Sequence, residues 1–121
     1  MDKERIANEL NDTLIEFHNT LCNPSTPCKN CEIDKYRKKY NVLGSCNAVY
    51  LAITLLGNTE DTAMFINKQY KIFKSTICKN DNFGFCFDKC YIRDLKEHAK
   101  ELENRGSCFY IYLGTILLND V

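Results

Sequence analysis

The sequence predicts a mainly α-helical, compact domain of four to five helices. The alternative is an α+β fold, in which the C-terminus forms a small β element. Apolar residues recur every three or four positions in three separate stretches, which is the spacing of one helix face. Prolines, glycines and asparagines stand between these stretches and predict the turns. Because 121 residues with 45% hydrophobic side chains suit one core, we expect residues 1–121 to form a single domain.

The first predicted helix covers residues 2–21. Asp2 places negative charge at its start, where the helix dipole favours it, and Pro24 and Pro27 follow its end. One apolar stripe runs along it, formed by Ile6, Leu10, Leu14, Phe17 and Leu21.

A turn-rich segment, 22–31, leads into a short helix over 32–40 and a connection over 41–44. Ser45 is the expected N-cap of an almost uncharged helix over 47–56, and Gly57 is its expected end. An element that is apolar on every side belongs in the core.

Two more amphipathic helices are expected over 59–73 and 88–105, separated by a loop over 79–84. Gly106 should supply a left-handed cap to the second of them. Residues 107–118 follow, and their β-branched and aromatic composition favours a strand, whereas their length also fits a buried helix.

The charge is balanced, with 16 basic and 16 acidic side chains, so binding to nucleic acid or to an anionic membrane would need a local patch. The first residues lack the apolar run of a secretory signal. No apolar stretch reaches the roughly 20 residues of a membrane-spanning helix. We therefore expect a cytoplasmic protein.

Eight cysteines in such a protein indicate reduced thiols, as metal ligands or as buried side chains. Cys28 and Cys31 have the two-residue separation at which a turn presents two thiolates to one tetrahedral ion. Cys22 and Cys46 complete a predicted four-thiolate site, which zinc suits best and an iron–sulfur cluster less well. His18, one turn before Cys22, could replace one thiolate.

The second group, Cys78, Cys86, Cys90 and Cys108, lies among aromatic residues. Both metal binding and burial in the core are open for these thiols, and burial is slightly favoured. Successive cysteines are separated by 5, 2 and 14 residues in the first group and by 7, 3 and 17 in the second. Because these spacings differ, we infer no internal repeat.

The function expected from these features is that of a non-enzymatic, metal-stapled regulatory module that binds a protein partner. The sequence has no glycine-rich phosphate loop and no convincing pair of catalytic carboxylates. Small inhibitors encoded by viruses or mobile elements often have this profile.

A first alternative is a nucleic-acid-binding zinc module. Its lysines and arginine would neutralise phosphates while its tyrosines stack on bases. The residues concerned are Lys29, Lys35, Tyr36, Arg37, Lys38, Lys39 and Tyr40.

A second alternative is a thiol enzyme. Gly44, Ser45 and Cys46 resemble the glycine-serine-cysteine element of papain-like proteases, over three residues, and place a cysteine at the start of an apolar helix. The resemblance implies a nucleophilic role for Cys46, with His18 or His98 as the base. Cys46 cannot be a free nucleophile and a ligand of a closed metal site at once.

Overall fold

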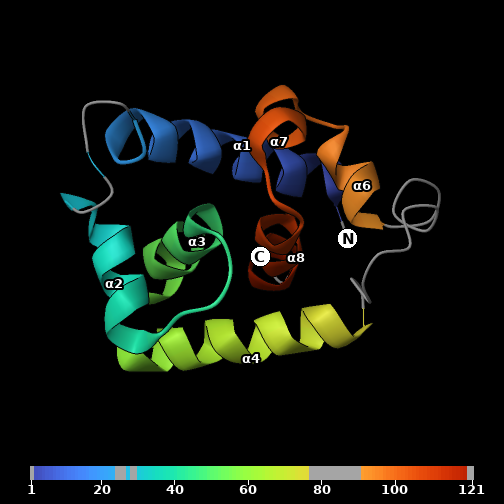
Figure 1. Cartoon of the computed structure of the whole chain (residues 1–121). Coiled ribbons are helices and arrows are strands. Elements are labelled where there is room, and N and C mark those ends of the chain that lie inside the picture. Colours follow the sequence, from blue (N-terminus) through green and yellow to red (C-terminus); the bar gives the residue numbers. More distant parts are fainter. Residues whose placement is uncertain (1, 24–26, 28–29, 77–90, 120–121) are drawn as a thin grey trace.

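The computed structural model describes residues 2–23, 27, 30–76 and 91–119. Within these ranges it contains seven helices and no strand, so the prediction of a mainly α fold is confirmed. Two long helices, α1 (Lys3–Thr20) and α4 (Glu60–Thr76), cross opposite sides of a central pair formed by α3 (Cys46–Leu56) and α8 (Cys108–Leu118) (Figure 1). α2 (Glu32–Tyr40) packs against α3 and α4, and α6 (Tyr91–Lys96) and α7 (Lys100–Arg105) pack against α1.

Local sequence signals set the ends of the first helices. The side chain of Asp2 caps α1 by accepting a hydrogen bond from the amide of Arg5 at 3.1 Å. Ser45 is the N-cap residue of α3, as predicted, and Gly57 ends that helix with a φ of +99°. Asn41 ends α2 in the left-handed conformation that asparagine tolerates.

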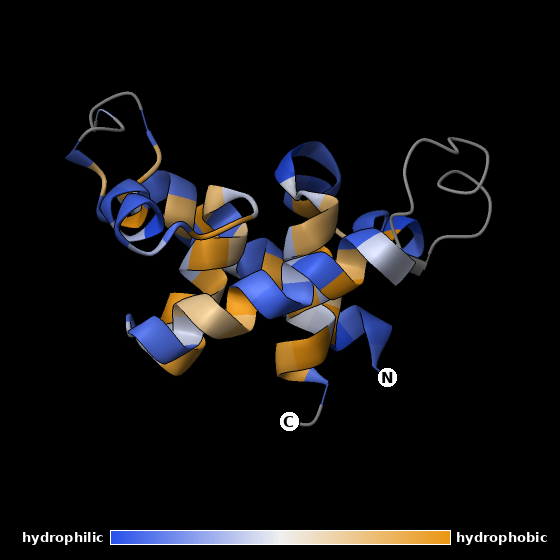
Figure 2. Cartoon of the chain, turned by 60° about the horizontal axis from the view of Figure 1, so that its bottom comes forward, coloured by the Kyte–Doolittle hydropathy of each residue, from blue (hydrophilic) through white to orange (hydrophobic). Residues whose placement is uncertain are grey.

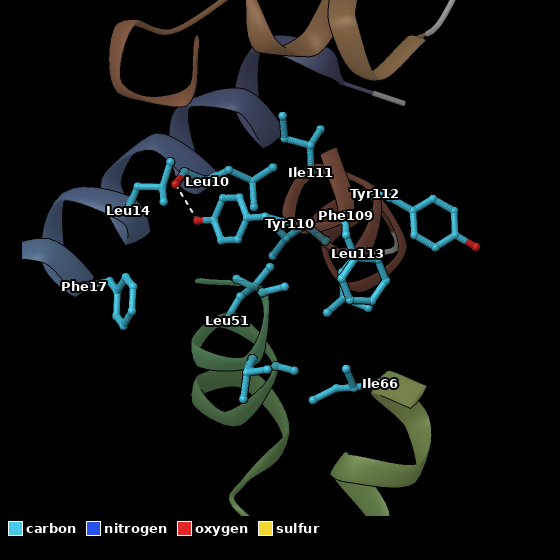
Figure 3. Packing of buried hydrophobic residues seen from close by; sticks show 14 of the residues in the cluster. Leu10, Leu14, Phe17, Leu51, Ile66, Phe109, Tyr110, Ile111, Tyr112 and Leu113 are labelled. Atoms are coloured by element: carbon cyan, nitrogen blue, oxygen red, sulfur yellow. Dashed lines mark hydrogen bonds between the residues drawn. The ribbon is translucent and has the colours of Figure 1, made fainter. Parts of the chain in front are cut away.

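The core forms where the stripes of the long helices meet α3 and α8. Leu10 and Leu14 of α1 are fully buried, and Tyr110 of α8 packs beside them (Figure 3). The Tyr110 hydroxyl donates to the Leu10 carbonyl at 2.6 Å. Figure 2 shows α8 as hydrophobic up to its C-terminal end, whereas α4 alternates between hydrophilic and hydrophobic residues. The two apolar helices therefore fill the centre, as an all-round apolar composition requires.

The prediction of a single helix over 88–105 is wrong in the part that the structure describes. Two helices, α6 and α7, are present there, and they are separated at Ala99, whose backbone is extended. The break turns α7 across α1, where the Asn11 side chain accepts a hydrogen bond from the Leu102 amide at 3.0 Å. Leu95 and Leu102 are both fully buried on either side of the break. Residues 88–90 and the loop predicted over 79–84 lie outside the described residues.

The left-handed cap predicted at Gly106 is also wrong, since its φ is −75°. Glycine is needed there for a different reason. A β-carbon at this position would lie 2.7 Å from the Leu102 carbonyl oxygen, which is the acceptor for the Gly106 amide. The close approach of Gly106 to the carbonyl of the preceding turn of α7 therefore selects glycine.

Of the two alternatives for residues 107–118, the buried helix is confirmed and the strand favoured by composition is wrong, because Cys108–Leu118 form α8. The Ser107 hydroxyl caps this helix by accepting from the Tyr110 amide at 3.2 Å. Eight of the 11 residues of α8 are buried. Tertiary burial thus overrides the β-propensity of its aromatic and β-branched residues.

Candidate metal centre

Three of the four predicted ligands lie in the described residues, each at a helix boundary. Cys22 follows the end of α1 and is exposed, and its amide donates to the Phe17 carbonyl at 3.0 Å. Cys31 is the N-cap residue of α2 and is buried. Cys46 is the first residue of α3 and is half-buried. The fourth, Cys28, lies outside the described residues.

A surface hollow of about 340 Å³ brings Cys22 and Cys46 together with His18. The end of α1 forms one wall, and the Ser-Cys-Asn start of α3 forms the other. The lining residues are Phe17, His18, Cys22, Ser45, Cys46, Asn47 and Arg105. Cys31 is not among them. The hollow therefore gathers two predicted thiol ligands and the histidine that was considered as a substitute ligand.

Arg37 makes the one polar contact described for the Cys46 thiol. Its Nη1 donates to Cys46 Sγ at 3.3 Å, and its Nε is buried without a hydrogen-bond partner among the described residues. A guanidinium and the N-terminus of a helix both interact favourably with negative charge. The Arg37 guanidinium and the start of α3 thus both lie beside the Cys46 sulfur, the atom through which a cysteine binds a metal or reacts as a nucleophile.

His18 is held at the rim of the hollow. Its ring packs against Phe17 with centroids 5.3 Å apart, and its Nδ1 lies 3.3 Å from the Cys22 carbonyl oxygen. With the proton on Nδ1, Nε2 is left as a lone-pair donor for a metal ion or as a base. His98 is exposed, in the turn between α6 and α7.

Among the described residues, no three histidine, cysteine, aspartate or glutamate side chains converge closely enough to hold a metal ion. The predicted set also includes Cys28, so these residues hold only part of it. In the second group, only Cys108 is described. It is the first residue of α8 and is exposed, so the expected burial is wrong for this thiol.

The predicted nucleic-acid surface is only partly available. Tyr36 is 8% exposed and donates its hydroxyl to the Thr59 carbonyl at 2.6 Å. Lys38 pairs with Asp34 at 2.9 Å, and the Lys39 ammonium lies 5.1 Å above the Tyr40 ring. Lys29 lies outside the described residues. The Tyr36 ring is thus largely covered, whereas stacking of a base needs an exposed ring face.

The role of Arg37 beside Cys46 is the feature that sequence reasoning missed. The arginine stood in a run of basic residues that suggested phosphate binding, and its nine-residue separation from Cys46 matches no ligand motif. Only the packing of α2 on α3 brings the two side chains together.

Comparisons with protein families, with curated proteins and with solved structures find no match to this chain. In the part of the chain that the structure describes, no helix has the length and apolar character needed to cross a bilayer.

Proposed function

We propose that this is a non-enzymatic cytoplasmic regulatory module that is stapled by zinc and binds a protein partner. The observation that supports the zinc site is the shared hollow, which Cys46, with Arg37 on its sulfur, lines together with Cys22 and His18. Cys22, Cys28, Cys31 and Cys46 are the proposed ligands. Zinc would tie the end of α1 to the starts of α2 and α3, across a proline-containing segment.

The zinc site is tested by native mass spectrometry and by thermal unfolding, with and without a chelator. Free zinc at about 1,000 times its Kd stabilises the folded state by about 4 kcal/mol, so chelation should lower the Tm by about 10 °C or more. Cys22→Ser should reduce zinc retention, whereas the nearby Thr20→Ser keeps its hydroxyl and should not. A chain that retains no zinc, with the same Tm in the chelator, would refute the proposal.

The α3–α4 corner is the proposed surface for the protein partner. The three most exposed large apolar side chains of the described residues flank this corner: Met64 (62% exposed), Leu56 (48%) and Leu55 (46%). Leu55 and Leu56 end α3 and Met64 lies in the first turns of α4, and exposed apolar surface is typical of interaction sites. Such a surface suits a partner that presents its own apolar side chains.

Met64→Glu should abolish capture of the partner from extracts of the source cells, and Ile15→Glu, a matched change on α1, should not. The captured protein, once purified, should bind the wild-type chain directly and the Met64→Glu variant at least tenfold more weakly. Capture that is indifferent to Met64 would exclude this surface.

A second candidate function, a cysteine nucleophile, has one specific observation in its favour: His18 and Cys46 line the same hollow. In such an enzyme the Cys46 thiolate would attack an acyl carbonyl and expel the leaving group, and His18 would then activate the water that releases the acid. p-Nitrophenyl acetate is a suitable probe. Turnover that disappears in Cys46→Ser and in His18→Asn would favour this role over zinc, and unchanged hydrolysis in both variants would exclude it.

A further inference from the structure

Two pairs of segments share residues that the cysteine spacings conceal. Residues 44–56 and 106–118 align without a gap and are identical at seven of 13 positions, beginning with Gly-Ser-Cys in each. They contain α3 and α8, which are both 11 residues long and follow a serine N-cap. Residues 16–22 and 72–78 align in the same way, and α1 and α4 end at the aligned Thr20 and Thr76. The expectation that the chain has no internal repeat therefore needs correction.

Contacts between the two halves are reciprocal. The alignment of α1 with α4 pairs Asn11 with Asn67. Each asparagine accepts a hydrogen bond from a backbone amide shortly before the Gly-Ser-Cys of the other half, at Leu102 (3.0 Å) and Leu43 (2.7 Å). Such an exchange of equivalent contacts is the mark of two copies related by a two-fold axis.

This local two-fold axis passes between α3 and α8. At one end of the pair, the N-cap hydroxyls of Ser45 and Ser107 are 2.8 Å apart. At the other end, Leu118 of α8 lines the same groove as Leu55 of α3. The two helices therefore lie side by side in the same direction. Their carboxyl ends form one face of the molecule, the carboxyl face, which α1 and α4 flank from opposite sides (Figure 1).

The α1 side of the carboxyl face is acidic. A groove of about 270 Å³ is lined there by Glu9 and Asp12 of α1 and by Leu55 of α3, which is 46% exposed. Arg5 pairs with Glu9 at 3.5 Å. Asp12 is exposed and forms no ion pair among the residues that the structure describes. An uncompensated carboxylate therefore stands beside an exposed leucine.

The aligned positions on the α4 side have the opposite character. Phe65 replaces Glu9, and Lys68 replaces Asp12. Lys68 is exposed, and within the described ranges it too forms no ion pair. The acidic wall is thus a property of one half and is not imposed by the repeated fold.

A contact between α4 and α8 places this stripe of α4 at the carboxyl face. Thr13 lines the groove beside α1, and the aligned Gln69 accepts a hydrogen bond from Tyr112 of α8 at 3.3 Å. Ile72 of α4 and Ile116 of α8 are each 37% exposed. The α4 side of the carboxyl face is therefore apolar and positively charged.

We propose that the carboxyl face binds a second copy of the chain, in a closed dimer whose two-fold axis is perpendicular to the local axis. The α4 side of each copy then lies on the α1 side of the other, so the same contact forms twice. Lys68 of one copy faces Glu9 and Asp12 of the other, and the exposed leucines and isoleucines leave water. The other perpendicular axis would bring acidic side against acidic side, which like charges disfavour.

This dimer goes beyond the proposed function. Leu55 belongs both to the carboxyl face and to the surface proposed for the protein partner. Self-association would therefore compete with the partner for the same side chain.

Sedimentation velocity of the purified full-length chain, over a range of concentrations and with a phosphine reductant, tests the dimer. The wild type should dimerise with a Kd that rises with salt. Asp12→Lys places lysine against lysine and Lys68→Asp places acid against acid, so each should raise the Kd at least tenfold. The double variant exchanges the charges of the two sides and should recover the wild-type Kd. Lys74→Asp, a matched change at the position aligned with His18 of the hollow beside Cys46, should have no effect.

Circular dichroism of each variant separates a lost contact from lost folding. Both exchanges introduce the residue found at the aligned position of the other half, so both helices should tolerate them. A wild type that stays monomeric would overturn the dimer and leave zinc retention and partner capture, the tests of the proposed function, unaffected. A dimer that neither single variant weakens, or that the folded double variant fails to restore, would overturn the pairing of α1 with α4. Assembly beyond a dimer would overturn the closed arrangement.

Discussion

Replacing Gly114 by alanine sets two opposing effects of similar size against each other. Gly114 lies inside α8, where alanine is favoured over glycine by about 1 kcal/mol. A β-carbon there, however, would overlap the side chain of Leu10, reaching within 2.8 Å of its Cδ1. Leu10 is fully buried and cannot retreat freely, and overpacking of this kind costs about 1–3 kcal/mol. We therefore expect Gly114→Ala to lower the free energy of unfolding by about 1 kcal/mol.

A double-mutant cycle with Leu10→Ala tests this reasoning in urea denaturation monitored by circular dichroism. Leu10→Ala alone creates a cavity and should cost about 2–5 kcal/mol. In that background the overlap is gone, so Gly114→Ala should now stabilise the protein by up to about 1 kcal/mol. The coupling energy between the two sites should thus be about 1–3 kcal/mol. If Gly114→Ala stabilises the wild-type chain, or if the two changes are additive, the proposed contact between α1 and α8 is wrong.

Two further predictions concern pH. Burial raises the pKa of Tyr110, so its contribution to stability is complete below the ordinary tyrosine value of about 10 and is lost as the pH rises. Ultraviolet titration should show Tyr110 ionising only as the protein unfolds, and Tyr110→Phe should remove that step; its ionisation in the folded protein would contradict this. The hydrogen bond from Lys3, at 2.6 Å, lowers the pKa of Asp94. This pair should stabilise the protein above about pH 4 and lose its effect as the pH falls through the lower folded value. Asp94→Asn should therefore change stability at neutral pH and not at pH 2, and an equal change at both would exclude the pair.

The amphipathic helices could be predicted because their buried side chains recur every three or four positions along the sequence. Leu10 and Ile66, on the predicted stripes of α1 and α4, are fully buried. The identity of α8 could not be read from its residues, because the side chains that favour a strand also suit a helix buried on all sides. The break at Ala99 could not be predicted either, since it depends on Asn11, which is 91 residues from its hydrogen-bond partner Leu102.

In the candidate site, too, features set by neighbouring residues could be predicted, whereas features set by the packing of distant helices could not. The spacing of Cys28 and Cys31 is a local motif, whereas the position of Cys22 and Cys46 around one hollow depends on how α1 packs near the start of α3. The repeat was concealed because intervals between cysteines change with every insertion in a connection. The residues next to the cysteines, Gly-Ser-Cys above all, lie in helices and helix caps, which tolerate insertions poorly.

A duplication within one chain also explains why the two halves differ where they meet. Near the local axis, the side-chain oxygen of Asn47 accepts hydrogen bonds from both N-cap hydroxyls, of Ser45 and Ser107. Its amide nitrogen donates to the Arg105 carbonyl at 3.4 Å. A symmetric pair would bring a second asparagine to the same buried space, where its polar groups would lack partners. The aligned residue is instead Phe109, which packs edge-on against Tyr70. In a dimer of two identical chains, both aligned positions would hold the same residue. In one chain they can differ, so Asn47 makes the polar contact and Phe109 makes the apolar one.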